Sequence, residues 1–203
     1  MYRFEIINTF IKKHNFKNYL EIGVFEGRNI REIIAPHKDG VDPTTELGKT
    51  IPEINYPITS DAFFDLIKGH DIKYDIIFID GLHISEQVNK DIQNALNHLV
   101  GGGIIVLHDC NPQVELWTKV PRQSEAWHGD VYKSVLHFRQ NYPHKFITVD
   151  DDCGCGVIFN NVPEDNKCSV DDLQQGMESW EHFNTNRKQL LNLISVDEFK
   201  ATY

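Results

Sequence analysis

The segment from residue 19 to residue 29 constrains the fold of this chain more than any other. It reads YLEIGVFEGRN, an apolar run that leads into Gly23 and Gly27 and then into a helical pattern. A buried strand followed by a glycine turn and a helix is typical of the first unit of a Rossmann-like domain. Glycine lets the backbone approach a ligand, and the N–H groups at the helix start can bind an anion. The segment therefore predicts a nucleoside-type ligand at the end of the first strand.

The pattern also discriminates between cofactors. Asp42 follows Gly23 by nineteen positions, where a carboxylate can accept hydrogen bonds from the two hydroxyls of a ribose. The spacing is Glu-x-Gly-x-x-x-Gly and not the G-x-G-x-x-G of dinucleotide sites. Glu21 would repel a pyrophosphate but attract a cationic sulfonium or its amino group. We therefore expect S-adenosylmethionine as the cofactor. The alternative is a strand-turn-helix connection whose glycines serve packing alone.

Composition narrows the class of protein. The chain has 203 residues, 40% of them hydrophobic, which is enough for one well-buried core. Neither a membrane span nor a signal peptide is visible in the sequence, so a cytoplasmic enzyme is expected. The net charge of −10 disfavours nucleic acid as a partner. Four cysteines, without C-x-x-C spacing, are interpreted as free thiols.

Apolar runs alternate with helical patterns, as in βα units around a parallel sheet. We expect an α/β fold: a Rossmann-like, mostly parallel sheet of seven strands, with helices on both faces and an antiparallel last strand. Residues 1–162 would form this domain, and residues 163–203 a helical C-terminal tail that packs on the domain, covers a site or joins a homodimer. The expected strands are 18–23, 38–42, 55–59, 74–80, 104–107, 145–150 and 155–160, and the expected helices of the domain are 4–14, 62–67, 84–99 and 131–141.

Functional side chains of an open α/β sheet gather where its strands end. Each Asp at such a position could by itself be a helix cap or a turn residue. Five acidic strand ends that face one crevice are difficult to explain by packing. The residues at the expected strand ends are Glu21, Asp42, Asp61, Asp80 with His83, and His108 with Asp109.

Several motifs together resemble the class I S-adenosylmethionine-dependent methyltransferases, specifically the small bacterial methyltransferase-24 type. The resemblance covers about residues 17–160 and extends into 186–199, and its specific parts are the segments 80–83 and 108–112. The sequence departs from the usual pattern at residues 100–101, where a proline is common, and at His128, where asparagine is frequent. The motifs are LEIG (20–23) with Gly27, TSDAFF (59–64), IFIDGLH (77–83), GGIIVLHDCNP (102–112) and WHGDVYK (127–133).

The resemblance implies roles for individual residues. Asn29 would bind the methionine carboxylate, Asp42 the ribose, and Ser60 or Asp61 the adenine. In metal-dependent relatives, residues that match Asp80 and Asp109 hold a divalent cation such as Mg²⁺. The implied cofactor-binding residues are Glu21, Gly23, Val24, Gly27, Asn29, Asp42, Ser60, Asp61 and Asp80.

The expected reaction is methyl transfer to a small hydroxyl-bearing acceptor such as a sugar or a secondary metabolite. The enzyme would align the hydroxyl and remove its proton, through a cation at Asp80 and Asp109 or through His83 or His108 as a base. The loop after residue 110 would bind the acceptor. An NAD-type oxidoreductase and a catalytically silent binding module are the alternatives. The expected acceptor-binding residues are Arg122, Trp127, His128 and Asp130.

Overall fold

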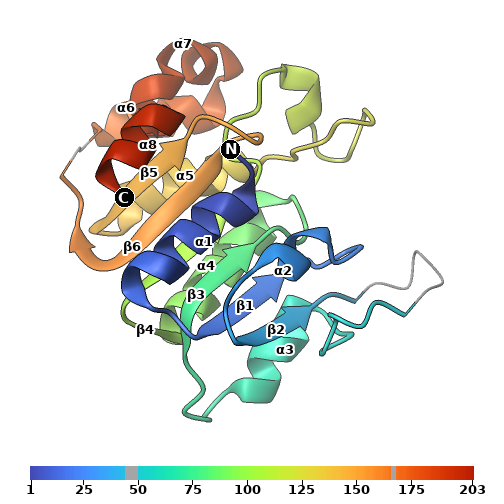
Figure 1. Ribbon diagram of the computed structural model, residues 1–203. Helices are drawn as coiled ribbons and strands as arrows, with labels where there is room; N and C mark the ends of the chain where they lie inside the picture. Colours follow the sequence, from blue (N-terminus) through green and yellow to red (C-terminus); the bar gives the residue numbers. More distant parts are fainter. Residues whose placement is uncertain (44–49, 166–167) are drawn as a thin grey trace.

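Near-continuous runs of β-branched and apolar residues form the centre of a seven-stranded sheet with the order β2-β1-β3-β4-β6-β5-β7 (Figure 1). The computed structural model describes residues 1–43, 50–165 and 168–203. The strands are β1 (Asn18–Ile22), β2 (His37–Val41), β3 (Tyr74–Ile79), β4 (Leu99–Leu107), β5 (His144–Val149), β6 (Cys155–Pro163) and β7 (Leu193–Ile194). The helices are α1 (Arg3–His14), α2 (Arg28–Glu32), α3 (Ser60–Ile67), α4 (Ser85–Asn97), α5 (Val131–Asn141), α6 (Val170–Glu178), α7 (Trp180–Leu190) and α8 (Val196–Thr202), with a 3₁₀ helix η1 at Glu115–Thr118.

The sheet is mostly parallel, as predicted. Strands β1 to β4 run parallel to one another, whereas β6 lies antiparallel to both β4 and β5. A tight turn makes this reversal, and Asp152, Cys153 and Gly154 in it all have positive φ angles. The antiparallel strand is therefore β6, and the last strand in sequence, β7, runs parallel to β5.

One predicted strand is wrong. Within 55–59 only an isolated bridge joins Tyr56 to Val41. The next residue, Pro57, has no N–H group to continue the ladder. The seventh strand is β7, which comes from the tail that the sequence predicts to be helical and pairs with Thr148 and Val149.

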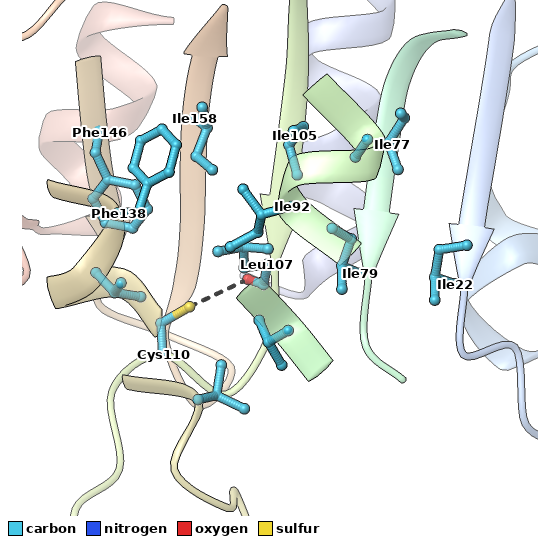
Figure 2. Packing of buried hydrophobic residues seen from close by; sticks show 14 of the residues in the cluster. Ile22, Ile77, Ile79, Ile92, Ile105, Leu107, Cys110, Phe138, Phe146 and Ile158 are labelled. Carbon is cyan, nitrogen blue, oxygen red and sulfur yellow. Dashed lines mark hydrogen bonds between the residues drawn. The ribbon is translucent and has the colours of Figure 1, made fainter. Parts of the chain in front are cut away.

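The two faces of the sheet carry separate apolar cores, because successive side chains of a strand point to opposite sides. In β3, Ile77 and Ile79 pack with α3, α4 and α5, while Ile76 and Phe78 pack with α1, α2 and α8. Figure 2 shows the first of these cores, where Ile92 of α4 lies against the strands. The predicted covering of both faces by helices is confirmed.

The described part of the tail packs on the domain. Its helical segment is divided at Ser179, whose side chain accepts from the N–H of His182 and so begins α7. Phe199 of α8 is fully buried, with its ring centroid 5.6 Å from that of Phe10 in α1. Among the described residues, no helix has both the length and the apolar character needed to cross a bilayer.

Phe199→Ala should test how far the tail stabilises the domain. Removal of this buried ring is expected to lower the free energy of unfolding by about 3–5 kcal/mol, because it leaves a cavity between α8 and α1. Urea denaturation measures the loss, and Lys200→Ala, at an exposed position of the same helix, is the control. A single unfolding transition with equal midpoints for the two variants would contradict the claim.

Candidate active site

Four predicted catalytic residues meet at the carboxyl ends of β3 and β4. His83 lies between two carboxylates, with its Nε2 3.3 Å from Asp80 Oδ1 and its Nδ1 3.1 Å from Asp109 Oδ2. His108 Nδ1 is 3.4 Å from Asp80 Oδ1 and 3.2 Å from Asp109 Oδ1. The parallel strands thus bring two acids and two histidines into one group, as expected from their positions.

The backbone holds Asp109 at a sharp turn. Its φ of 59° lies in the left-handed region, which few residues other than glycine adopt and which Asp tolerates better than most. The N–H of Cys110 then donates to the carbonyl of Gly154 at 3.0 Å. The end of β4 is therefore fixed against the turn between β5 and β6.

Two residues that the sequence did not indicate complete this group. Arg3, the first residue of α1, donates from Nη1 to Asp80 Oδ2 at 2.7 Å. Its Nε and Nη2 donate to the two oxygens of Asp152 at 2.9 and 3.1 Å. Asp152 Oδ1 is also 3.5 Å from His108 Nε2. We call these six residues the charged cluster: Arg3, Asp80, His83, His108, Asp109 and Asp152.

Mutual attraction within the charged cluster outweighs the cost of burial. Burial favours neutral Asp80, but His108 and His83 hold its pKa well below the usual range. Burial also opposes charge on the two histidines, yet the neighbouring carboxylates, Asp80 first, raise both pKa values. The cluster is thus held together by charge-assisted hydrogen bonds from Arg3 and by ion pairs between the histidines and the carboxylates.

A second group of polar residues lies at β1, in the expected cofactor pocket. The hydroxyl of Tyr19 donates to Glu21 Oε2, and Asn29 Nδ2 donates to the same oxygen at 2.8 Å. Asn29 Oδ1 is buried and makes no hydrogen bond. Burial raises the pKa of Glu21 to about 7, although its bonds to Tyr19 and Asn29 oppose the shift. Tyr19 is an addition to the predicted set.

The glycines of the β1–α2 turn have different roles. Gly23 has a φ of 89°, and a Cβ there would come within 2.1 Å of the Asp80 carbonyl oxygen. Gly23 therefore has a packing role, as the alternative interpretation of the glycines proposed, because the loops after β1 and β3 are in contact here. Gly27, with φ 76°, precedes the five-residue helix α2. Val24 is buried in the apolar core that also contains Ile76 and Phe78.

The remaining predicted cofactor residues lie farther along the sheet edge. Asp42 Oδ2 accepts from the N–H of Phe25 at 2.6 Å, which ties the end of β2 to the β1–α2 turn. Ser60 and Asp61 begin α3, and both accept from Gln87 of α4, at 3.3 and 2.9 Å. These two residues are therefore joined to α4, and neither is hydrogen-bonded to the charged cluster.

The predicted acceptor residues divide into two pairs. The ring of Trp127 stacks on His83 with centroids 5.4 Å apart, and buried His128 has its Nε2 3.7 Å from Asp109 Oδ1. Asp130 instead accepts from the N–H and hydroxyl of Ser85 at 2.7 and 3.0 Å, at the start of α4. Arg122 donates to carbonyls of its own loop, at Ser124 and Glu125. Only Trp127 and His128 thus contact the charged cluster.

A separate cavity of about 480 Å³ lies between α6 and α7. Its walls are polar and include Glu178, Glu181 and His182. None of the predicted site residues lines it. We therefore base the site on the charged cluster and on Tyr19, Glu21 and Asn29. We call these three residues the β1 pocket, because the cofactor is expected there.

Comparisons with known proteins give the class of this fold. Residues 20–110 match a family model described as a methyltransferase domain, of the type Methyltransf_24. No curated protein matches the chain. This segment is thus similar to a methyltransferase domain, and the resemblance predicted from the motifs is confirmed. The matched segment runs from β1 to the end of β4, so Arg3 and Asp152 lie outside it.

Solved structures agree on the fold at low sequence identity. The S-adenosylhomocysteine-bound methyltransferase PaMTH1 of Podospora anserina is 12% identical, with a TM-score of 0.59 over 78% of either chain. An O-methyltransferase from Bacillus cereus, in complex with S-adenosylhomocysteine, has a TM-score of 0.58 at 12% identity over 78% of this chain and 80% of that one. The O-methyltransferase TomG from Streptomyces achromogenes, in complex with S-adenosylmethionine, is 12% identical. Its TM-score is 0.56, and the match covers 78% of this chain and 79% of TomG.

The raised pKa of Glu21 predicts how stability depends on pH. A carboxyl group whose pKa is raised on folding stabilises the folded state while it is protonated. This contribution is complete below pH 4.5 and is lost as the pH rises through about 7. Between these values the free energy of unfolding should fall by about 3 kcal/mol through this group.

Glu21→Gln should remove that part of the pH dependence, because the amide does not ionise. Urea denaturation at a series of pH values measures it in both proteins. Equal slopes of stability against pH in the variant and the parent would show that Glu21 does not titrate in this range.

Proposed function

We propose that the protein transfers a methyl group from S-adenosylmethionine to a hydroxyl of a small acceptor. The observation that carries this proposal is the position of the charged cluster beside the β1 pocket, where Gly23 meets the backbone of Asp80. A sulfonium held by β1 would then lie next to groups able to orient a hydroxyl. The O-methyltransferase activities and bound cofactors named for the similar structures support the same assignment.

The β1 pocket has the polar atoms that the cofactor requires. The buried Asn29 Oδ1 lacks a hydrogen-bond donor, and the ammonium group of the methionine moiety would supply one. Ionised Glu21 beside it would add charge attraction. Asn29 would then contact the amino group, where the family resemblance implied the carboxylate. Asp42, at the end of β2, would accept from the ribose hydroxyls.

The reaction needs alignment of the acceptor and removal of one proton. Both ring nitrogens of His83 and of His108 already face carboxylates of the charged cluster. His108 Nε2 and His128 Nδ1 are both buried without a hydrogen bond, but His108 Nε2 lies 3.5 Å from Asp152 Oδ1, whereas His128 faces Asp109 through its Nε2 and not its Nδ1. If the hydroxyl of the methyl acceptor reaches His128 Nδ1, it can donate a hydrogen bond to this ring nitrogen. His128 is thus a candidate base as well as a binding residue.

A divalent cation is the alternative that the family resemblance implies for activating the hydroxyl. Ligand atoms of Asp80, His83 and Asp109 lie within 4.8 Å of one another, but Asp80 Oδ2 is already bound by Arg3 Nη1 at 2.7 Å. A set with one imidazole suits Mn²⁺, Fe²⁺ or Zn²⁺ better than Mg²⁺, which prefers oxygen ligands. When bound, the ion would polarise the hydroxyl and lower its pKa.

Aromatic side chains give the acceptor site its chemical character. Trp127 stacks on His83, and the ring of Trp117 lies 5.3 Å from that of His128. Flat apolar faces beside hydrogen-bonding groups suit a sugar or an aromatic secondary metabolite. We therefore propose a small polar acceptor and no macromolecular one.

Binding of S-adenosylhomocysteine tests the cofactor. At one hundred times its dissociation constant the ligand should stabilise the fold by about 2.7 kcal/mol, measured by thermal melting. Asp42→Ala should weaken binding by roughly 1–3 kcal/mol, because a charged acceptor for two hydroxyls is lost. Asp65→Ala, which removes an exposed carboxylate of α3, is the control. Stabilisation by NAD in place of S-adenosylhomocysteine would favour the oxidoreductase alternative.

Transfer from labelled S-adenosylmethionine to a panel of hydroxyl-bearing acceptors tests the catalytic assignment. Asp109→Asn and His128→Ala should each lower kcat by about 100-fold or more, because each removes a group that contacts the proton-transfer site. Arg122→Ala removes a cation 5.9 Å from the Trp127 ring but no contact with the charged cluster, so it should leave kcat within about threefold of the parent. A silent binding module would transfer no methyl group to any acceptor while still binding the cofactor.

A further inference from the structure

The N-terminal helix places a fixed positive charge in the active site. Arg3 makes four hydrogen bonds to the charged cluster: one from Nη1 to Asp80 and three to Asp152, from Nε, Nη2 and the backbone N–H. A guanidinium is always charged, and its planar fork matches carboxylates. One side chain therefore bridges two acids that the chain separates by seventy-two positions.

The rest of α1 holds this arginine in place. Ile6, Ile7, Phe10 and Ile11 are buried against the sheet, so the helix cannot shift without exposing them. The N–H of Arg3 donates to Asp152 Oδ2 at 2.8 Å, which also fixes the start of the helix. The guanidinium is thus positioned by packing as well as by charge.

A divalent ion and Arg3 would compete for Asp80. The ion needs Asp80, His83 and Asp109 together. Asp80 Oδ2 is already 2.7 Å from Arg3 Nη1, and its other oxygen faces His83 and His108. An ion bound there would lie close to the guanidinium and be repelled by it, and it would also have to displace bonds to the histidines.

We propose that Arg3 is a positioning residue that takes the place of a divalent cation at Asp80, so that this methyltransferase works without a bound metal. The inference rests on the proposed function for the reaction, but the cation competition stands on the charged cluster alone. Arg3 orients Asp80 and Asp152, and it contacts neither oxygen of Asp109. The acceptor-facing side of the cluster therefore remains available.

Titration with Mn²⁺ alone tests the competition, with free Mn²⁺ followed by electron paramagnetic resonance. The parent protein should bind Mn²⁺ only weakly. Arg3→Gln keeps a polar side chain but removes the charge, and it should bind Mn²⁺ at least about tenfold more tightly. Arg31→Gln is the control, because Arg31 pairs with Glu53 outside the cluster and its loss should leave Mn²⁺ affinity unchanged.

A second variant keeps the test decisive if Arg3→Gln does not fold. Arg3→Lys retains the charge, but a single ammonium cannot bridge Asp80 and Asp152 in the manner of the fork. Its Mn²⁺ affinity should rise severalfold, to a value between those of the parent and the glutamine variant. Tight Mn²⁺ binding by the parent, or no gain in either Arg3 variant, would overturn the inference.

Activity and cofactor binding separate this inference from the proposed function. A chelator should leave methyl transfer by the parent unchanged. Thermal melting with S-adenosylhomocysteine is run on the same samples. Failure of S-adenosylhomocysteine to bind would remove the proposed function but not the cation competition, whereas loss of activity with the chelator would overturn the role of Arg3 alone.

Discussion

Attraction between Asp80 and three surrounding cationic groups organises the functional half of this molecule. Burial alone would make the carboxylate neutral, yet His108 and His83 keep its pKa low, and Arg3 pairs with its other oxygen. Each partner comes from a different segment: the first turn of α1, the loop after β3 and the end of β4. One partly buried charge thus requires that three separate parts of the chain be in register, and the folded state is stabilised at the candidate active site.

The local units of this fold were predictable because their patterns are strong. The apolar run of a strand buried on both faces predicts the bounds of β3 to within a residue or two. The apolar stripe of an amphipathic helix does the same for α4. One error has a local cause and the other a distant one. Pro57 prevents a strand at an apolar run, and β7 pairs only because β5 offers a free edge. Local periodicity carries no information on either event.

The site shows the same division. Asp80, His83, His108 and Asp109 were predictable because parallel strands end on one side of a sheet. Arg3 was not, since an arginine at the start of an amphipathic helix is ordinarily solvent-exposed, and its partner Asp152 lies 149 residues away. Asp130 carries a charge typical of a binding residue, but its carboxylate accepts from the N–H of Ser85, the first residue of α4. Residue type and strand position therefore locate the site, while partners across the fold decide each role.

The loop from residue 111 to 130, which is proposed to bind the acceptor, has a fixed part and an exchangeable part. A Cβ at Gly129 would come within 1.6 Å of the His83 carbonyl oxygen, so residue 129 must stay glycine. The N–H groups of His128 and Gly129 both bind the carbonyl of Trp117, and the indole N–H of Trp127 binds the carbonyl of Lys119. These anchors on the outer loop are backbone carbonyls, which any residue supplies. Side chains from 113 to 126 could thus be redesigned to accept a different molecule while 127–130 keep the site intact.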